Sequence, residues 1–441
     1  MKKLLKNAIV VTMAANNTVW KKGWVLVNGS VIEALGEGEY NGDTAETEVI
    51  DMSGKLVMPG FVNAHSHFAG SLFKGLLEDD PNGFYGYALP MEINLTAEDV
   101  YYLSLAGSYE SLASGITTAN EIYHFADAVA QAACDIGIRA IVAQNIVDTD
   151  ISRLRYNDYT RDAKKGEAFL EDNIALIEKY HGKDNGRITC RVGPHATDTV
   201  SMELAKKCVQ TAEKYGVGLH MHTAQSPREN RVVMEQYGLT PVEYMKQVGE
   251  LGPQTMAAHC VYVNDNDIKL MAESGMHMVH CTKSFAKDSA FAPMQKILDA
   301  GVDVTLGTDW VTMDPWMNIR YAVGINRHHN VCMEYTSSEF LLRKFTIEAA
   351  KALGLGNITG SLERGKQADI QVIDMQQPHL LPVFHDVLPL LVHNCTRSDV
   401  CDVMVRGKFV IRNRILTTMN QKDILLDTQK TADRLYAFRV V

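Results

Sequence analysis

A regular alternation of short apolar runs with helix-length amphipathic segments constrains the fold most. The apolar runs lie at 56–65, 116–120, 138–145, 188–194, 217–222, 255–259, 277–280 and 303–308. The helix-length segments between them include 97–114, 167–180, 202–215, 265–274 and 293–300. Strands that alternate with helices pair in parallel through right-handed crossovers, and about eight of them favour a closed ring over an open sheet. We therefore predict an α/β fold with a TIM-like (β/α)8 barrel.

The two ends of the chain have a different texture of short strands and turns. Asn28-Gly29 separates the apolar residues 24–27 from 31–32, a strong signal for a β-hairpin. Strand-like sequence returns at 368–373 and 403–411. We predict a small β-sandwich domain built from both chain ends. The expected parts are residues 1–57 with 365–420 for the β domain, 58–364 for the barrel, and 421–441 for a C-terminal surface helix.

Composition excludes several classes of partner. The 441 residues are 46% hydrophobic and 22% charged, with a formal net charge of -10. A chain of this acidity offers no basic patch to nucleic acid or to an anionic membrane surface. No apolar run approaches the roughly 20 residues of a membrane-spanning helix. We therefore expect a globular protein that binds neither nucleic acid nor membranes.

The cysteines and the N-terminus bear on the cellular compartment. Eight cysteines are scattered without a CxxC pair, as is typical of reduced thiols. The first 15 residues resemble a secretory leader, but Lys6 and Asn7 interrupt their short apolar part. These residues also run directly into strand-like sequence. We expect a cytoplasmic protein.

Histidine or aspartate ends most of the apolar runs. Reactive residues of a (β/α)8 enzyme lie at the C-terminal ends of its strands, so these side chains are expected to meet. Imidazole and carboxylate suit zinc or iron, and three or four such ligands plus water make an open catalytic site. The pattern predicts a mononuclear hydrolytic metal site. The residues concerned are His65, His67, His195, His220, His222, His259, His280 and Asp309.

All of these residues except His280 belong to stretches that carry a resemblance along essentially the whole chain. The stretches are PGFVNAHSH (59–67), SGITTANE (114–121), GPHATDT (193–199), LHMH (219–222), AAHCVYVNDND (257–267), DAGVDVTLGTD (299–309) and GSLERGKQADIQVID (360–374). The chain resembles the amidohydrolase superfamily, and within it the chlorohydrolases and aminohydrolases that act on triazines, purines and pyrimidines.

The resemblance implies a set of ligands and a reaction. It implies one divalent ion, Zn²⁺ first and Fe²⁺ as the alternative, on His65, His67, His222 and Asp309. His259 would be a catalytic histidine, and Asp309 would also act as general base. We predict a hydrolase that displaces an amino group from a small nitrogen heterocycle. Two alternatives stay open: displacement of another leaving group such as chloride, and a degenerate protein that binds without turnover. A homo-oligomer, dimeric or larger, is expected.

One departure from this pattern lies three residues after His222. Deaminating relatives carry a glutamate there that shuttles a proton, whereas this chain has Gln225, whose amide cannot transfer one. Either Asp309 and His259 carry all the proton transfer, or another acid serves, or the leaving group needs no proton. Gln225 is retained among the catalytic residues. We expect Glu229 to face solvent on the next helix.

Two further departures concern the expected substrate. Trp310 and Trp316 occupy a loop that is usually small, where they could pack against the rim or form a wall that stacks a flat heterocycle. Ser284 lies where relatives often have Pro-x-Ser-Asn. The long segment 70–96 is a candidate substrate lid. We assign no role to His124. The candidate substrate-binding residues are His195, His280, Trp310, Trp316 and Ser284.

Overall fold

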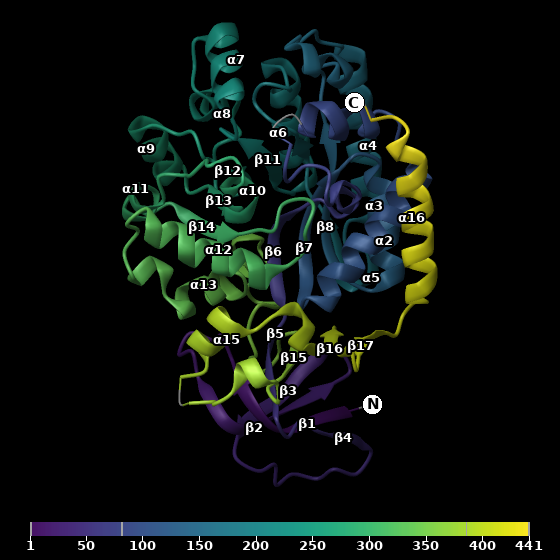
Figure 1. Ribbon diagram of the computed structural model, residues 1–441, viewed down its shortest axis with the longest axis vertical. Coiled ribbons are helices and arrows are strands. Elements are labelled where there is room, and N and C mark those ends of the chain that lie inside the picture. The colour runs from purple at the N-terminus through teal and green to yellow at the C-terminus, as the bar shows by residue number, and fades with distance from the viewer. Residues whose placement is uncertain (1, 81–82, 385, 440–441) are drawn as a thin grey trace.

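The fold has two parts, a ring of parallel strands covered by helices and a β sheet at one end of that ring (Figure 1). The computed structural model describes residues 2–80, 83–384 and 386–439. The chain begins in the β sheet, passes through the ring and returns to the sheet. It ends in a helix that runs along the side of the ring. The predicted combination of a (β/α)8 barrel with a small β domain is confirmed.

Two sets of parallel strands make the barrel. One set has the order β10-β8-β7-β6, with β9 also paired to β8, and the other has the order β11-β12-β13-β14. Parallel bridges from Val192 to Leu219 and from Ser66 to Asp309 close the two sets into a ring. In the described chain the ring has eight positions, because β9 and β10 share the fourth. The strands are β6 (Phe61–Ser66), β7 (Ile116–Tyr123), β8 (Arg139–Ile146), β9 (Ile188–Cys190), β10 (Gly193–Pro194), β11 (Leu219–Thr223), β12 (Thr255–His259), β13 (His277–His280) and β14 (Asp303–Leu306).

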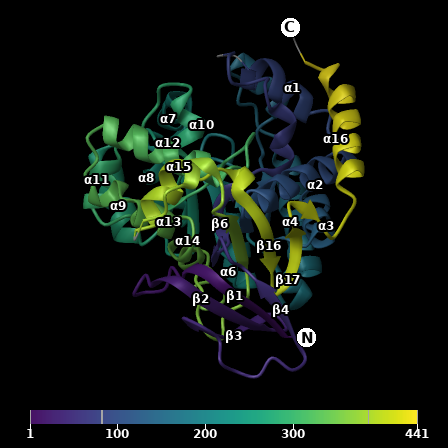
Figure 2. The ribbon, with the colours of Figure 1, turned by 60° about the horizontal axis from the view of Figure 1, so that its bottom comes forward.

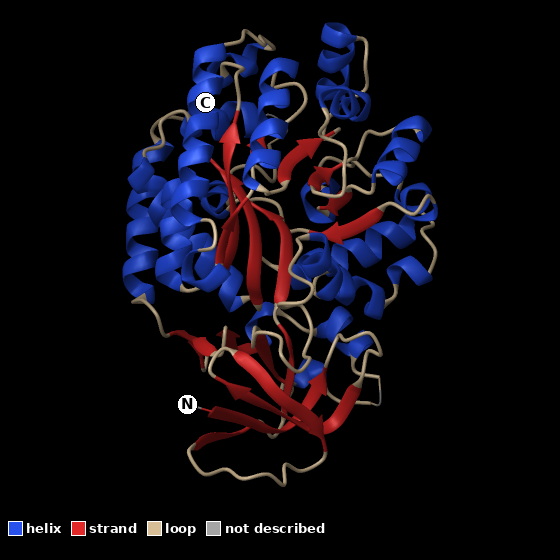
Figure 3. Cartoon of the chain, turned by 180° about the vertical axis from the view of Figure 1, so that it is seen from behind, coloured by secondary structure: helices blue, strands red, loops and turns tan. Residues whose placement is uncertain are grey.

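Helices cover the outside of the ring (Figure 3). Several begin at side chains that cap them: Thr96, Thr240 and Asn264 each form a capping box with the residue three positions later. The helices of the barrel region are α1 (Leu89–Glu92), α2 (Ala97–Ala113), α3 (Ala126–Ile136), α4 (Ala163–Tyr180), α5 (Lys183–Gly186), α6 (Met202–Tyr215), α7 (Pro227–Tyr237), α8 (Pro241–Val248), α9 (Asp265–Ser274), α10 (Thr282–Ala286), α11 (Met294–Asp299), α12 (Pro315–His328), α13 (Ser338–Lys344) and α14 (Ile347–Ala352). The α15 helix (Leu388–Asn394) follows in the C-terminal part.

The small β domain combines strands from both ends of the chain. The strands hydrogen-bond as one sheet in the order β18-β17-β16-β15-β5-β1-β2-β3, with β4 also paired to β1. The expected β-sandwich domain is therefore built from one continuous hydrogen-bonded sheet. The hairpin expected at Asn28-Gly29 is present between β2 and β3. On this pairing we propose the division into a composite β domain, a barrel and a C-terminal helix. The strands are β1 (Lys2–Val11), β2 (Val19–Asn28), β3 (Val31–Glu37), β4 (Thr47–Asp51), β5 (Lys55–Pro59), β15 (Ile370–Asp374), β16 (Val400–Val405), β17 (Lys408–Arg412) and β18 (Ile415–Leu416).

The apolar run 56–65 is two strands, not the single strand that we predicted. β5 pairs with β1 and β15 in the small sheet, whereas β6 begins in the barrel beside β7. The chain changes sheets at Gly60, where a Cβ would lie 2.2 Å from the side chain of Thr117. Only glycine fits this approach. The strand that carries His65 is therefore joined directly to the β domain.

The segment after β6 and the C-terminal helix cover two parts of the barrel. Short helical pieces, η1 (Phe68–Phe73) and η2 (Phe84–Ala88), precede α1 in the candidate lid, whose role stays a prediction. The α16 helix (Gln421–Tyr436) packs along α2 (Figure 2), and Arg434 forms an ion pair with Asp99 there. Among the described residues, no helix combines the length and the hydropathy that a membrane span needs.

Candidate active site

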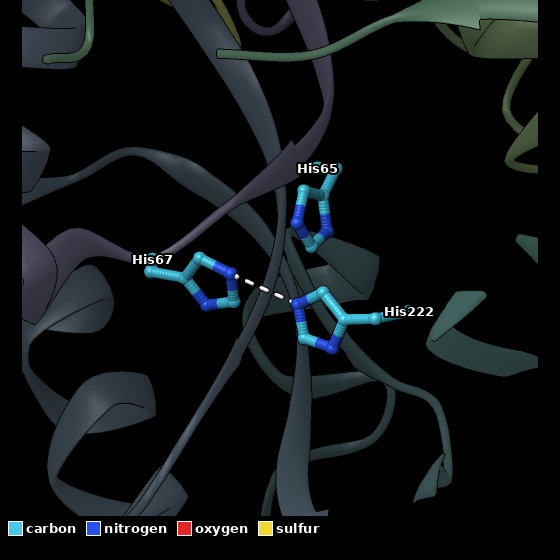
Figure 4. A group of neighbouring side chains, drawn as sticks. All are labelled: His65, His67 and His222. Carbon is cyan, nitrogen blue, oxygen red and sulfur yellow. Dashed lines mark hydrogen bonds between the residues drawn. The ribbon is translucent and has the colours of Figure 1, made fainter. Parts of the chain in front are cut away.

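Three histidine rings converge where β6 and β11 end (Figure 4). His65 lies in β6, His67 directly follows that strand, and His222 lies near the end of β11. The Nε2 atoms of His67 and His222 are 3.2 Å apart. All three rings are buried. The predicted meeting of strand-terminal histidines is therefore seen in the side-chain positions.

Asp309 and His259 join the same centre from β14 and β12. The Oδ1 atom of Asp309 lies 3.4 Å from Nε2 of His65 and 3.4 Å from Nε2 of His67. The His259 ring is 5.2 Å from the His65 ring, centroid to centroid. Two overlapping groups result, His65–His67–His222 and His65–His259–Asp309, each with its metal-binding atoms within 4.8 Å of one another.

The backbone at two of these residues is unusual. His259 has φ = 84° and Asp309 has φ = 61°, in the left-handed region that residues other than glycine rarely adopt. Such a conformation costs on the order of 1–3 kcal/mol and persists where the surroundings impose it. The Asp309 N–H donates to the carbonyl of His65 at 3.0 Å. This bond fixes the turn that brings the Asp309 carboxylate against the histidines.

Backbone carbonyls orient two of the histidine rings. Nδ1 of His67 lies 2.6 Å from the carbonyl of Ile122, and Nδ1 of His222 lies 2.8 Å from the carbonyl of His195. Because a carbonyl only accepts hydrogen bonds, each Nδ1 must carry a proton. In the neutral rings the lone pair is then on Nε2. Both Nε2 atoms face the centre of the site, as metal ligands do.

Charges at the site are set by burial and by the Asp309 carboxylate. Burial lowers the pKa of His65 to about 4 and that of His259 to about 3. Burial alone would lower the pKa of His67, but Asp309 raises it. Burial would likewise raise the pKa of Asp309, but the His65 and His67 side chains, whose Nε2 atoms lie 3.4 Å from its Oδ1, hold it well below its ordinary value. Asp309 is therefore a carboxylate at neutral pH, and His65 and His259 are neutral.

The centre has unpaired polar atoms that a cation would satisfy. Nε2 of His65 and Nδ1 of His259 are buried and have no hydrogen-bond partner in the described part of the chain. Leaving such an atom unpaired costs about 1–3 kcal/mol. Neutral imidazoles and one carboxylate make a donor set that suits zinc or ferrous iron and leaves a position open for water. The residues fit one divalent ion.

Two candidate substrate-binding histidines lie beside this centre. The ring of His195, which follows β10, is 4.8 Å from the ring of His222, and its Nδ1 is 2.7 Å from the hydroxyl of Thr199. His280 is buried at the end of β13, and its Nε2 is unpaired among the described residues. His280 also contributes to the low pKa of His259, after burial and the nearer charges. That either residue contacts the substrate stays a prediction.

Ser284 and Trp310 line a cavity of about 240 Å³ together with Lys283 and Tyr321. Trp310 directly follows Asp309 in the sequence. The centroid of its ring lies 5.5 Å from the ring centroids of Phe73 and Phe84. Trp310 thus stands between the end of β14 and the candidate lid. The aromatic wall that stacks a heterocycle stays a prediction for Trp310.

Trp316 does not belong to that wall, and our prediction for it is wrong. Its side chain is 0% exposed, and its ring lies 4.8 Å from the ring of Phe61, at the start of β6. Phe345 packs against the same Phe61 ring. The cause is α12, which begins at Pro315 and turns Trp316 away from the loop into the core. Trp316 stabilises the barrel and does not line the site.

Gln225 and Glu229 lie side by side next to the site. The Gln225 amide is partly exposed and makes no side-chain hydrogen bond with the described residues. The expectation that Glu229 faces solvent is wrong: it is 0% exposed and accepts hydrogen bonds from the Thr197 hydroxyl (2.5 Å) and the Gln225 N–H (2.7 Å). Burial, with the neighbouring Asp198, raises the pKa of Glu229. The Ser-Pro-Arg-Glu sequence at 226–229 predicts a helix start, but not that this carboxyl turns back to the loops.

His124 is a second residue that sequence reasoning missed. It follows β7, which extends to Tyr123 and not only to 120 as predicted. Its Nε2 lies 3.2 Å from Nδ2 of Asn145 near the end of β8. Burial lowers the pKa of His124 to about 4. Sequence reasoning left His124 out of the strand-terminal histidines because the predicted strand ended at residue 120, whereas β7 ends at Tyr123.

The chain is similar in sequence to known proteins along nearly its whole length. A family model described as the amidohydrolase family matches residues 56–410. The chain belongs to this family. The amidohydrolase is 33% identical over 442 residues to 5-methylthioadenosine/S-adenosylhomocysteine deaminase of Thermoanaerobacter pseudethanolicus, covering 99% of both chains. It is also 33% identical to 5'-deoxyadenosine deaminase of Methanosarcina mazei, covering 98% of both.

Solved structures give the same fold. An adenosine deaminase from Xanthomonas campestris with bound zinc is 26% identical, with a TM-score of 0.89 over 99% of this chain and 98% of that one. A triazine hydrolase variant, at 22% identity, has a TM-score of 0.88 over 98% of this chain and 99% of that one. The second likeness shows that this amidohydrolase and a triazine hydrolase share a fold.

Proposed function

We propose that this amidohydrolase removes the exocyclic amino group of an adenine nucleoside by hydrolysis. One observation carries the proposal: His65, His67, His222 and Asp309 converge at the ends of barrel strands, with His259 beside them. Two relatives at 33% identity are named as deaminases of 5-methylthioadenosine and S-adenosylhomocysteine and of 5'-deoxyadenosine. These compounds share an adenine ring on a ribose whose 5' position is modified. We therefore expect a substrate of this class.

We infer that the four converging residues would hold one divalent ion, with zinc first and Fe²⁺ as the alternative. Zinc is bound in the solved adenosine deaminase from Xanthomonas campestris. Such an ion makes a water molecule acidic enough to act as a nucleophile near neutral pH. The unpaired Nε2 of His65 and the low pKa of Asp309 support this assignment, because both groups offer lone pairs at neutral pH.

Asp309 is the residue placed to move a proton. It is ionised, and its Oδ1 lies 3.4 Å from two proposed ligand nitrogens, so it can accept a proton from the attacking water. His259 is neutral and has an unpaired buried Nδ1, which can hydrogen-bond to that water or to the oxygen that forms on the ring carbon. His195, His280, Ser284 and Trp310 are proposed to contact the substrate.

The proton balance assigns Gln225 a limited role. Water adds its oxygen to the ring carbon, and the amino group departs as ammonia, which requires one more proton than the amino group carries. Asp309 can take that proton from the water and return it to the departing nitrogen. The Gln225 amide can donate or accept a hydrogen bond at the ring but cannot transfer the proton. We propose that Gln225 orients the heterocycle.

A second candidate reaction is displacement of a leaving group that needs no proton, such as chloride on a triazine-like ring. Gln225 favours it, because the proton-transferring glutamate of deaminating relatives is absent here. A chain that binds metal and ligand without turnover is the remaining alternative. The convergence of five reactive side chains speaks against it.

Product analysis separates these reactions. The zinc-loaded chain would be incubated with 5-methylthioadenosine, S-adenosylhomocysteine, 5'-deoxyadenosine and adenosine, and with a chlorinated s-triazine. We expect one ammonia per nucleoside consumed and no chloride. Chloride release without ammonia would establish the second reaction. Zinc binding without either product would contradict both.

We also propose a homo-oligomer, dimeric or larger, in a reducing compartment such as the cytoplasm. All eight cysteines are unpaired, which agrees with a reducing compartment. The mass in solution, measured by light scattering, tests the assembly. A monomer at micromolar concentration would contradict it.

A further inference from the structure

His220 is a buried histidine that the proposed mechanism does not use. It lies in β11, two residues before His222, and is 0% exposed. Its Nε2 is 2.8 Å from Nδ1 of His65. The two rings are nearly perpendicular, with an interplanar angle of 88°. An edge of His220 therefore meets the side of His65 that faces away from Asp309.

His65 differs in this respect from the other two histidines of the site. His67 and His222 present Nδ1 to backbone carbonyls, at 2.6 Å and 2.8 Å. A carbonyl can only accept, so those two rings have a fixed tautomer. His65 instead presents Nδ1 to an imidazole, which can either donate or accept. Only for His65 does the tautomer depend on a side chain.

The direction of that hydrogen bond decides whether His65 can bind a metal. If His65 donates from Nδ1, its Nε2 keeps a lone pair beside Asp309. If His220 donates instead, a neutral His65 carries its proton on Nε2 and has no lone pair there. We propose that His220 is a positioning residue, which selects the metal-binding tautomer of His65 by accepting its Nδ1–H. This inference rests on the metal site of the proposed function.

The proposed tautomer leaves one N–H group of the His65–His220 pair without a hydrogen-bond partner in the described part of the chain, so a bound ion is needed to favour it. With Nε2 of His220 as acceptor, its own proton lies on Nδ1, a buried atom without a hydrogen-bond partner among the described residues. The reverse tautomers would put a proton on Nε2 of His65, 3.4 Å from Oδ1 of Asp309, and would leave no lone pair there for the ion. Metal binding at His65 therefore fixes both rings at once. Removing the acceptor should weaken metal binding without removing any ligand.

Zinc affinity of the full chain tests the inference. His220→Met removes the acceptor, and His220→Gln is its matched control, because both side chains are unbranched and similar in size while only Gln offers an oxygen. Zinc alone would be titrated against a competing chelator, with His65→Ala as the reference for a lost ligand. We expect about 10- to 100-fold weaker binding in H220M, the range typical of lost partners of metal-binding histidines. In H220Q the affinity should stay within a few-fold of the parent chain.

The outcomes separate this inference from the proposed function. If the parent chain binds no zinc, the proposed function fails. If it binds zinc and H220M binds equally well, or if H220Q is weakened as much as H220M, the tautomer role of His220 is overturned. Should H220M fail to fold, ring ¹⁵N NMR of the zinc-loaded parent chain decides instead. The inference requires a protonated Nδ1 on His65 and an unprotonated Nε2 on His220, and the reverse pattern would overturn it.

Discussion

The two halves of the site are built differently. The half formed by strand ends holds His65, His67, His222 and Asp309, which are buried and hydrogen-bonded to backbone or to another ring. The half formed by loops holds Gln225, Ser284 and Trp310, which are partly exposed, and the last two line a cavity. A rigid centre suits the metal and the proton transfer, whereas loops can change without disturbing the strands. From this comparison we propose that the strand ends determine the reaction, whereas the loops determine which substrate is bound.

Replacing Asp309 should have the largest effect. Asp309→Asn keeps the shape of the side chain but can neither accept a proton nor give the site its negative charge. We expect kcat to fall by about 10²- to 10⁴-fold, the range typical of a lost general base. Circular dichroism should show an unchanged fold. Activity near that of the parent chain would show that the strand-end half does not set the reaction.

Trp310 and Trp316, only six residues apart in the sequence, sharpen the comparison. Trp316→Ala should lower the free energy of unfolding by about 3–5 kcal/mol, because Trp316 is buried against Phe61. Denaturant titration measures this, and KM should not change. The matched variant Trp310→Ala should instead raise KM by several-fold with little loss of stability. A raised KM without a loss of stability in W316A would place Trp316 in the site after all.

Restoring the relatives' glutamate tests the loop half directly. Gln225→Glu adds a group that can carry a proton to the departing nitrogen, so we expect kcat/KM for ammonia release to rise by about 10-fold. Any release of chloride from a triazine should not rise with it. An equal change in both reactions would mean that residue 225 acts on the whole site rather than on the leaving group.

Glu229 contacts the loop half through the Gln225 N–H, and its effect should be the smallest. Its pKa is raised by burial, so the folded chain holds its proton more tightly than the unfolded chain does. That stabilisation is complete below the unfolded pKa near 4.5 and is lost as the pH rises toward about 8. Glu229→Gln cannot titrate. The stability of the parent chain relative to E229Q should therefore fall, by on the order of 1 kcal/mol or more, between about pH 5 and about pH 8. Denaturant midpoints at the two pH values measure this, and a constant difference would contradict it.

The strand-end half could be predicted from sequence because one rule covers it. A histidine or aspartate that ends an apolar run must face the same edge of a parallel barrel as the others, whatever the loops do. The barrel order and the meeting of the strand-end side chains follow from that rule, whereas the expected ligand set came from the resemblance to the amidohydrolase superfamily. Gly60 shows its limit, because the run before His65 crosses from one sheet to another without any break in hydrophobicity.

The loop half could not be predicted in the same way. Trp316 is turned inward by a helix that begins one residue earlier, and Glu229 is turned back from the first turn of α7 to the loops before it. Tertiary contacts determine whether each of these side chains lies in the core, in the site or in solvent. The spacing of residues along the chain does not encode those contacts. His124 was hidden by only three additional residues of β7.

The most direct test of the central claim starts from the chain after a chelator has removed its metal. Zinc is then added back stepwise, with ammonia release from 5-methylthioadenosine as the readout. The account predicts no release without metal, a rise in proportion to added zinc, and saturation at one ion per chain. Asp309→Asn measured alongside should stay inactive at every zinc concentration. Ammonia release that is undiminished in the metal-free chain would contradict the account.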